Sequence, residues 1–197
     1  MLRATRGFGI LENFLSIQRM KIAQKSIKKH NKTGKILDIG CGTYPFFLIN
    51  SEFEEKVGID QILNPIEIKD LNLSLKNYNL TEEKVLPFHK NSFDTITMLA
   101  FIEHIDPKKV DSLLKNCYKI LKKEGILFLT TPAKWSHLPL KIMAKFRLVS
   151  PDEIREHKQT YYLNELVKKL KEAGFEYKNI EKGYFEFFLN LWICAKK

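Results

Sequence analysis

Short runs of apolar residues recur along the chain, and longer stretches with a helical spacing of apolar positions separate them. Continuous apolar runs rich in β-branched residues are typical of strands that are covered on both faces. Such runs predict four strands, at residues 35–40, 56–60, 94–100 and 125–131.

Three stretches have apolar residues every three or four positions and predict amphipathic helices, at residues 10–27, 107–123 and 162–173. Asp106 can cap the second helix, with Pro107 in its first turn, and Gly174 can end the third. Strands that alternate with helices predict an α/β fold with a doubly wound, mostly parallel sheet.

The chain ends in an aromatic-rich segment of extended character at residues 184–195. We expect its aromatic side chains to form the core of terminal strands: Tyr184, Phe185, Phe187, Phe188 and Trp192. Core packing is also the expectation for Tyr161 and Tyr162.

No repeat, low-complexity tract or Pro/Gly/Ser-rich linker divides the 197 residues. This length suits one domain with a full core. We therefore expect a single domain over residues 1–197, with an N-terminal helical cap at 1–33. The connection at 135–160 is long and predicts a lid.

Composition excludes some classes of protein. The 44% hydrophobic and 28% charged residues are ordinary for a globular protein, and no apolar run is long enough to span a bilayer. Cys41, Cys117 and Cys194 form no CxxC pair, which favours reduced thiols in the cytoplasm and no metal site. The net charge of +10 is compatible with nucleic acid, anionic lipid or an acidic small substrate. It is also explained by lysines spread over solvated helix faces.

A glycine-containing turn follows the first predicted strand, at Asp38-Ile39-Gly40-Cys41-Gly42. Glycines permit positive φ and let the backbone approach a ligand closely. Asp60 ends the next strand and can accept hydrogen bonds from the hydroxyls of a ribose. In parallel sheets, ligands bind beyond the carboxyl ends of the strands, which is where both elements fall.

Further segments follow in a fixed order: Leu86-Pro87-Phe88, Asn91 to Asp94, Phe101 to Ile105, Leu121 to Leu127 and Ala173-Gly174-Phe175. Together with the glycine turn and Asp60, they resemble the class I S-adenosylmethionine-dependent methyltransferases (methyltransferase type 11-like) over residues 34–178. The resemblance implies a Rossmann-like, seven-stranded sheet and S-adenosylmethionine as cofactor. It also implies a set of cofactor-binding residues: Asp38, Gly40, Cys41, Gly42, Tyr44, Asp60, Gln61, Asn79, Leu80, Ala100 and Phe101.

The chain departs from the family pattern at two places. Tyr44-Pro45 stands where the family has a third glycine, so we expect a stiffer loop with Tyr44 at the edge of the pocket. Asn79 stands where the family often has an acid that reaches the adenine amino group, and its side-chain oxygen can still accept a hydrogen bond. These two departures favour a further interpretation of the chain, as a non-catalytic cofactor-binding protein.

Methyl transfer from a sulfonium is an in-line displacement, so the protein mainly positions the reactants. A base is needed only where the acceptor loses a proton. His104 is the candidate base, and a purely structural role in the following turn stays open. His137 and His157 lie in the lid region, where substrate contacts come from in this family.

The expected function is methyl transfer to a small-molecule, saccharide or lipid-linked acceptor. A nucleic-acid, or RNA, methyltransferase is the alternative suggested by charge. We do not expect it, because Ala100 to Glu103 lacks the Asn/Asp-Pro-Pro-aromatic step of base-amino methylation. In the lid, apolar residues interleave with Lys141, Lys145 and Arg147, which indicates either peripheral membrane contact or the lid's own packing face.

Overall fold

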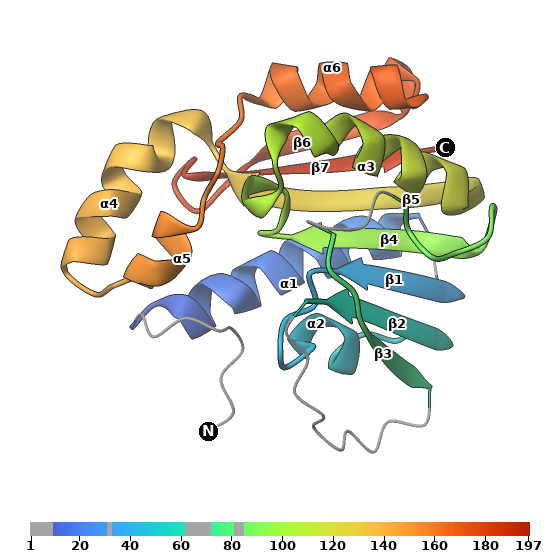
Figure 1. Ribbon diagram of the computed structural model, residues 1–197, viewed down its shortest axis with the longest axis horizontal. Coiled ribbons are helices and arrows are strands. Elements are labelled where there is room, and N and C mark those ends of the chain that lie inside the picture. The colour runs from blue at the N-terminus through green and yellow to red at the C-terminus, as the bar shows by residue number, and fades with distance from the viewer. Residues whose placement is uncertain (1–9, 31–32, 62–71, 81–84) are drawn as a thin grey trace.

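The computed structural model of the protein describes residues 10–30, 33–61, 72–80 and 85–197. The described residues form one seven-stranded sheet in the order β3-β2-β1-β4-β5-β7-β6 (Figure 1). Strands β1 to β5 pair in parallel, and β7 runs antiparallel to both β5 and β6. The strands are β1 Lys35–Ile39, β2 Glu55–Asp60, β3 Leu73–Asn77, β4 Phe93–Leu99, β5 Leu121–Pro132, β6 Ile180–Phe185 and β7 Asn190–Lys196.

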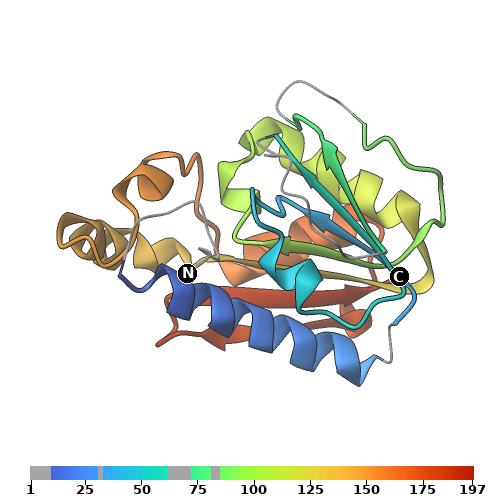
Figure 2. The same cartoon turned by 90° about the horizontal axis from the view of Figure 1, so that it is seen from below.

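Helices cover both faces of the sheet. Figures 1 and 2 show α3 and α6 on one face and α1 and α2 on the other, while α4 and α5 lie beyond the end of β5. The α-helices are α1 Glu12–Lys29, α2 Phe46–Ile49, α3 Pro107–Ile120, α4 His137–Lys145, α5 Pro151–Arg155 and α6 Leu163–Ala173. Short 3-10 turns are η1 Ile102–His104, η2 Lys134–Ser136 and η3 Tyr177–Asn179. The predicted α/β class with a mostly parallel sheet is confirmed.

The alternation of side chains along each strand divides the core in two. On β1, Ile36 packs with Ala23 of α1 and Phe47 of α2. Leu37 and Ile39 of the same strand pack with the helices of the opposite face. Both sheet faces are therefore buried, as the continuous apolar runs predicted.

Helix α3 begins as predicted but ends earlier. The Asp106 carboxylate accepts a hydrogen bond from the Lys108 backbone N–H at 2.9 Å, which confirms the cap. The predicted end at residue 123 is wrong, because Leu121 is already extended and pairs with Phe93 of β4. Glu124 then takes φ 63°, and the β4–β5 register shifts between Phe93 and Thr95.

The C-terminal aromatics are not all core residues. The register of β6 and β7 ends with Phe185 opposite Asn190, and the turn beyond it leaves Phe187 96% and Phe188 67% exposed. The expectation that these two phenylalanines form the core is wrong. So is core packing of Tyr162, which is 55% exposed, whereas Tyr161 is fully buried as expected.

The predicted lid consists of η2, α4 and α5, and only part of its apolar stripe faces inward. Leu140, Ala144 and Val149 are buried. Leu138, Ile142 and Phe146 are exposed, so the whole stripe is not the lid's packing face. None of the described helices is long and apolar enough to cross a membrane. The first nine residues of the expected N-terminal cap lie outside the described residues.

Candidate functional site

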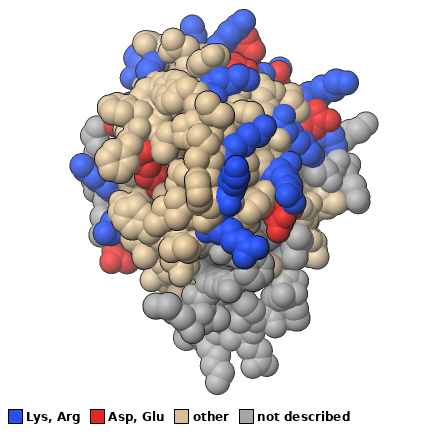
Figure 3. All heavy atoms as spheres, turned by 90° about the vertical axis from the view of Figure 1, so that its left-hand side faces the viewer, with Lys and Arg blue, Asp and Glu red and all other residues tan. Residues whose placement is uncertain are grey.

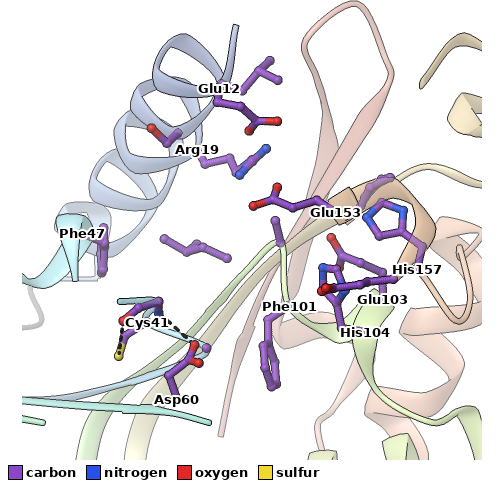
Figure 4. Close-up of a pocket in the computed structure, with 18 of the residues that line it drawn as sticks. Glu12, Arg19, Cys41, Phe47, Asp60, Phe101, Glu103, His104, Glu153 and His157 are labelled. Atoms are coloured by element: carbon purple, nitrogen blue, oxygen red, sulfur yellow. Dashed lines mark hydrogen bonds between the residues drawn. The ribbon is translucent and has the colours of Figure 1, made fainter. Parts of the chain in front are cut away.

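A cavity of about 520 Å³ opens at the carboxyl ends of β1, β2 and β4. Residues of α1 also line the cavity, and the lid helices α4 and α5 contribute Leu140, Ile154 and their neighbours to its wall. Figure 4 shows Cys41 and Asp60 on one side of the cavity and Glu103, His104 and His157 on the other, with Phe101 between them. The site therefore lies where parallel sheets commonly bind ligands.

The glycine turn exposes its backbone to the cavity. Gly40 and Gly42 take φ values of 78° and 73°, which side chains rarely adopt. A Cβ added at Gly40 would lie 2.1 Å from the Phe101 ring, so only glycine fits there. The Gly42 N–H donates to the Asp60 carboxylate at 2.9 Å. This bond joins the turn after β1 to the end of β2.

Asp38 is buried beneath the turn, and its carboxyl accepts a hydrogen bond from the Thr97 hydroxyl at 2.7 Å. Burial raises the pKa of Asp38 to about 7, the Thr97 bond opposes this shift, and the charge of Asp60 adds to it. A cationic group of a ligand bound nearby would favour the charged carboxylate.

The thiol of Cys41 is uncharged, because burial first and the charges of Asp38 and Asp60 second raise its pKa. Cys41, Cys117 and Cys194 are buried thiols that form no disulfide with one another.

The residues of this cavity fit S-adenosylmethionine, a ligand with a ribose, an adenine ring and two cationic centres. Asp60 lines the wall beside the backbone of Gly40 and Gly42, and its carboxylate would accept hydrogen bonds from the ribose hydroxyls of such a ligand. Leu80 and Phe101 supply apolar surface for a flat ring.

Most of the residues predicted from the sequence line this one cavity: Asp38, Gly40, Cys41, Gly42, Tyr44, Asp60, Gln61, Leu80, Ala100, Phe101, His104 and His157. Asn79 and His137 do not. Tyr78 and Leu80 belong to the described wall, whereas Asn79, which lies between them in the sequence, does not. His137 begins α4, is exposed and is not among the described residues of the wall.

Glu103, His104 and His157 form a cluster in which one potential ligand atom from each lies within 4.8 Å of the others. Glu103 is 1% exposed, and its Oε2 accepts a hydrogen bond from the Thr131 hydroxyl at 2.8 Å. Among the described residues, Glu103 Oε1 and His104 Nδ1 have no partner although both are buried. Unpaired polar atoms of this kind suit proton transfer or a divalent cation.

The lid completes this cluster. The backbone N–H of Lys158 donates to the Glu103 carbonyl at 2.9 Å, which holds the end of the lid against η1. The rings of His104 and His157 meet edge to face with centroids 5.0 Å apart. Burial lowers the pKa of His157 although the Glu103 charge opposes it, so neutral imidazole is favoured near pH 7.

Sequence reasoning missed the contribution of α1. Glu12, Ser16 and Arg19 line the cavity, and the Arg19 Nε is buried with no partner among the described residues. Figure 4 shows Glu12 and Arg19 directed from α1 toward the cavity, and Glu153 of the lid facing them. The signal was present in the sequence, because polar residues recur at helical spacing within an otherwise apolar stripe.

Comparison with known proteins identifies the family. Residues 12–180 match the family described as "Methyltransferase domain". The chain belongs to this methyltransferase family. A ubiquinone biosynthesis O-methyltransferase of Pelagibacter ubique is 30% identical over 130 residues, which are 62% of this chain and 50% of that protein. The tRNA N(3)-methylcytidine methyltransferase Mettl2 of Drosophila melanogaster is 33% identical over 106 residues, 47% of this chain and 32% of that protein. The chain thus spans half the length of the first relative and about a third of the second.

Solved structures support the fold of this methyltransferase domain. A S-adenosylmethionine-dependent methyltransferase from Archaeoglobus fulgidus aligns with a TM-score of 0.66 at 18% identity, covering 90% of this chain and 94% of that one. One from Mesorhizobium loti aligns with a TM-score of 0.67 at 14% identity, covering 93% and 100%. The resemblance to class I methyltransferases inferred from the sequence is confirmed, and with it S-adenosylmethionine as the methyl donor of the family. The roles of individual site residues stay predictions.

Proposed function

We propose that this methyltransferase transfers a methyl group from S-adenosylmethionine to a hydroxyl group of a small-molecule, saccharide or lipid-linked acceptor. The observation that carries the proposal is the Glu103–His104–His157 cluster in the wall of the cavity. A neutral hydroxyl is a poor nucleophile and must lose its proton as it attacks, so it benefits from a nearby base.

The roles of the residues follow from their places in the cavity. Asp60 and the turn around Gly42 would hold and orient S-adenosylmethionine. When bound, the cofactor would supply an activated methyl carbon to the acceptor oxygen, with the sulfonium sulfur as the leaving group. His104 or His157 takes the hydroxyl proton, and the buried Glu103 carboxylate stabilises the resulting imidazolium.

The names of relatives support oxygen as the acceptor atom. The Pelagibacter ubique protein and one from Actinobacillus pleuropneumoniae are both named ubiquinone biosynthesis O-methyltransferases. We also place the reaction in the cytoplasm, because free thiols such as Cys41 and Cys117 persist in a reducing compartment.

The test is turnover with a panel of phenolic and polyol acceptors, comparing wild type with His104→Gln and His157→Gln. We expect at least one variant to lose turnover by about a hundredfold or more while calorimetry finds its cofactor affinity unchanged. His89→Gln is the matched control, since His89 is exposed and does not line the cavity. Full turnover in both cluster variants would refute a base role.

A second candidate function is RNA methylation. The likeness to the Drosophila melanogaster tRNA methyltransferase and the net charge of +10 favour it. Gel shifts with tRNA at low salt discriminate between the two, because backbone binding there is strong and falls steeply with salt. Salt-sensitive binding together with a methylated nucleoside in the digest would replace the proposed acceptor class with RNA.

Non-catalytic cofactor binding is the remaining interpretation. Protein purified without added cofactor should carry S-adenosylmethionine or its demethylated product. The demethylated product would indicate turnover, whereas unreacted cofactor with no activity on any acceptor would favour a binding protein.

A further inference from the structure

The outer face of α4 is an exposed apolar stripe. Leu138, Ile142 and Phe146 are four residues apart and therefore lie along one side of the helix. They are 66%, 51% and 67% exposed, whereas Leu140 and Ala144 on the opposite side are buried. Trp135 precedes the helix and is 46% exposed. Large apolar side chains gathered in this way mark an interaction surface.

Basic side chains flank this stripe. Residues 134–147 contain Lys134, Lys141, Lys145 and Arg147 and no acidic residue. A hollow of about 430 Å³ between α4 and α5 is lined by basic residues, Lys141, Lys145, Arg147 and Arg155, together with Ala144, Pro151 and Ile154. Arg155 also pairs with Asp152 at 3.5 Å, so the lysines and Arg147 carry most of the free charge. Figure 3 looks onto this end of the molecule and shows several Lys and Arg side chains, with a few acidic ones among them, beside a broad and largely uncharged surface.

The β6–β7 turn extends the apolar surface. Its two phenylalanines, Phe187 and Phe188, are exposed, and three consecutive residues from Glu186 take positive φ. The ring centroids of Trp135 and Tyr184 are 5.0 Å apart, and those of Tyr184 and Phe188 are 6.1 Å apart. These contacts connect the turn with the start of the lid. Side chains from two separate segments therefore form one continuous surface.

We propose that this surface, made by residues 134–147 and the turn at 186–188, docks on a membrane of anionic phospholipids. An interfacial helix has an apolar stripe that enters the acyl boundary and lysines or arginines that meet lipid phosphates. Both parts are present on α4, and the basic hollow beside it suits a phosphate headgroup. A second protein fits less well, because lysine is depleted at protein–protein interfaces.

Docking through this surface would bring the cavity that contains Asp60 and Glu103 close to the membrane. The inner side of the lid lines the cavity through Leu140, Val149 and Ile154, while its outer side forms the proposed docking surface. A lipid-linked acceptor would then have a short path to the site. This last step rests on the proposed function, whereas membrane binding itself does not.

The test is co-sedimentation of the full chain with phosphatidylcholine vesicles and with vesicles containing about 30% phosphatidylglycerol. We expect binding to the anionic vesicles only, weakened at least tenfold in Leu138→Ser/Phe146→Ser and in Lys141→Glu/Lys145→Glu. Lys115→Glu/Lys119→Glu on α3 is the matched control, because it changes the charge equally on another face and both lysines are exposed. Circular dichroism checks that each variant folds.

A second measurement locates the contact. The sequence has two tryptophans, so Trp192→Phe leaves Trp135 as the sole reporter. Anionic vesicles should shift its emission to the blue, and brominated lipid should quench it.

Several outcomes would overturn the proposal: no binding, equal binding of the control and lid variants, or Trp135 emission unchanged by vesicles. Apolar variants that convert a dimer to a monomer would show instead that the surface joins two copies. Failure of the proposed function looks different, since vesicle binding would persist while no hydroxyl acceptor turned over.

Discussion

Asp60 both fixes the glycine turn and lines the cavity, and substitutions can separate these two roles. Its carboxylate accepts the Gly42 N–H and lines the cavity wall. Asp60→Ala should weaken S-adenosylmethionine binding by about a hundredfold or more, because the loss of hydrogen bonds to a charged acceptor costs about 1.5–3 kcal/mol each. Isothermal titration calorimetry measures this.

Asp60→Asn is the informative companion variant. Its amide oxygen can still accept the Gly42 N–H, so the turn should keep its shape while the negative charge is lost. We expect affinity between those of the wild type and Asp60→Ala. Wild-type affinity in the alanine variant would show that the cofactor site is assigned wrongly.

At the scale of elements, α1 and the lid are tied to each other. The Glu12 carboxylate at the start of α1 is buried and accepts the Ser150 backbone N–H at 2.7 Å. The backbone of Ile10 and Leu11 bonds to the carbonyls of Arg147 and Leu148. The lid is therefore positioned by the beginning of the described chain.

Glu12→Ala should loosen the lid without loosening the sheet. The variant leaves a buried N–H unpaired, at a cost of about 1–3 kcal/mol. Hydrogen exchange in α4 and α5 should accelerate by roughly tenfold or more, while β4 and β5 stay protected. Glu176→Ala is the control, because the Glu176 side chain is exposed and forms a surface ion pair with Lys178. Unchanged exchange in the lid would contradict this role of Glu12.

Local sequence patterns predicted most helices and strands, but not which of these elements pack against one another. Buried strands such as β1 and β4 appear as apolar runs, and Asp106 gave the start of α3. The edge strand β3 was not predicted, because its residues are mostly exposed and form no apolar run. The stripe on α4 does not tell which of its residues face inward, since that depends on where the lid packs.

The candidate site was predictable where the chemistry is local. Asp38, Gly42 and Asp60 belong to short motifs at strand ends, and the fold places them together. Arg19 reaches the same cavity only because α1 packs across the sheet, a long-range contact that no short motif contains. The same reason explains why His157, from the lid, meets Glu103.

For the whole molecule, the buried Asp38 links stability to pH. Its pKa in the folded protein is about 7, against an ordinary value of 3.8, so the folded state holds the proton more tightly than the unfolded chain. Raising the pH from about 4 to about 7 therefore favours unfolding, by on the order of 4 kcal/mol from this group.

Denaturant unfolding of wild type and Asp38→Asn at several pH values tests this. The wild-type free energy of unfolding should fall relative to that of the variant between pH 4 and 7, and the difference should level off above that range. Subtracting the variant removes the titration of carboxyls that do not interact with Asp38. A difference that stays flat, or rises with pH, would show that Asp38 is charged in the folded protein.

The two sides of the lid have a thermodynamic consequence. One side of α4 lines the cavity and the other is open to solvent, so any shift of the helix changes both surfaces. Coupling between two binding events is reciprocal. If occupancy of the inner side steadies the helix, cofactor should raise the affinity for vesicles, and vesicles should raise the affinity for cofactor by the same factor.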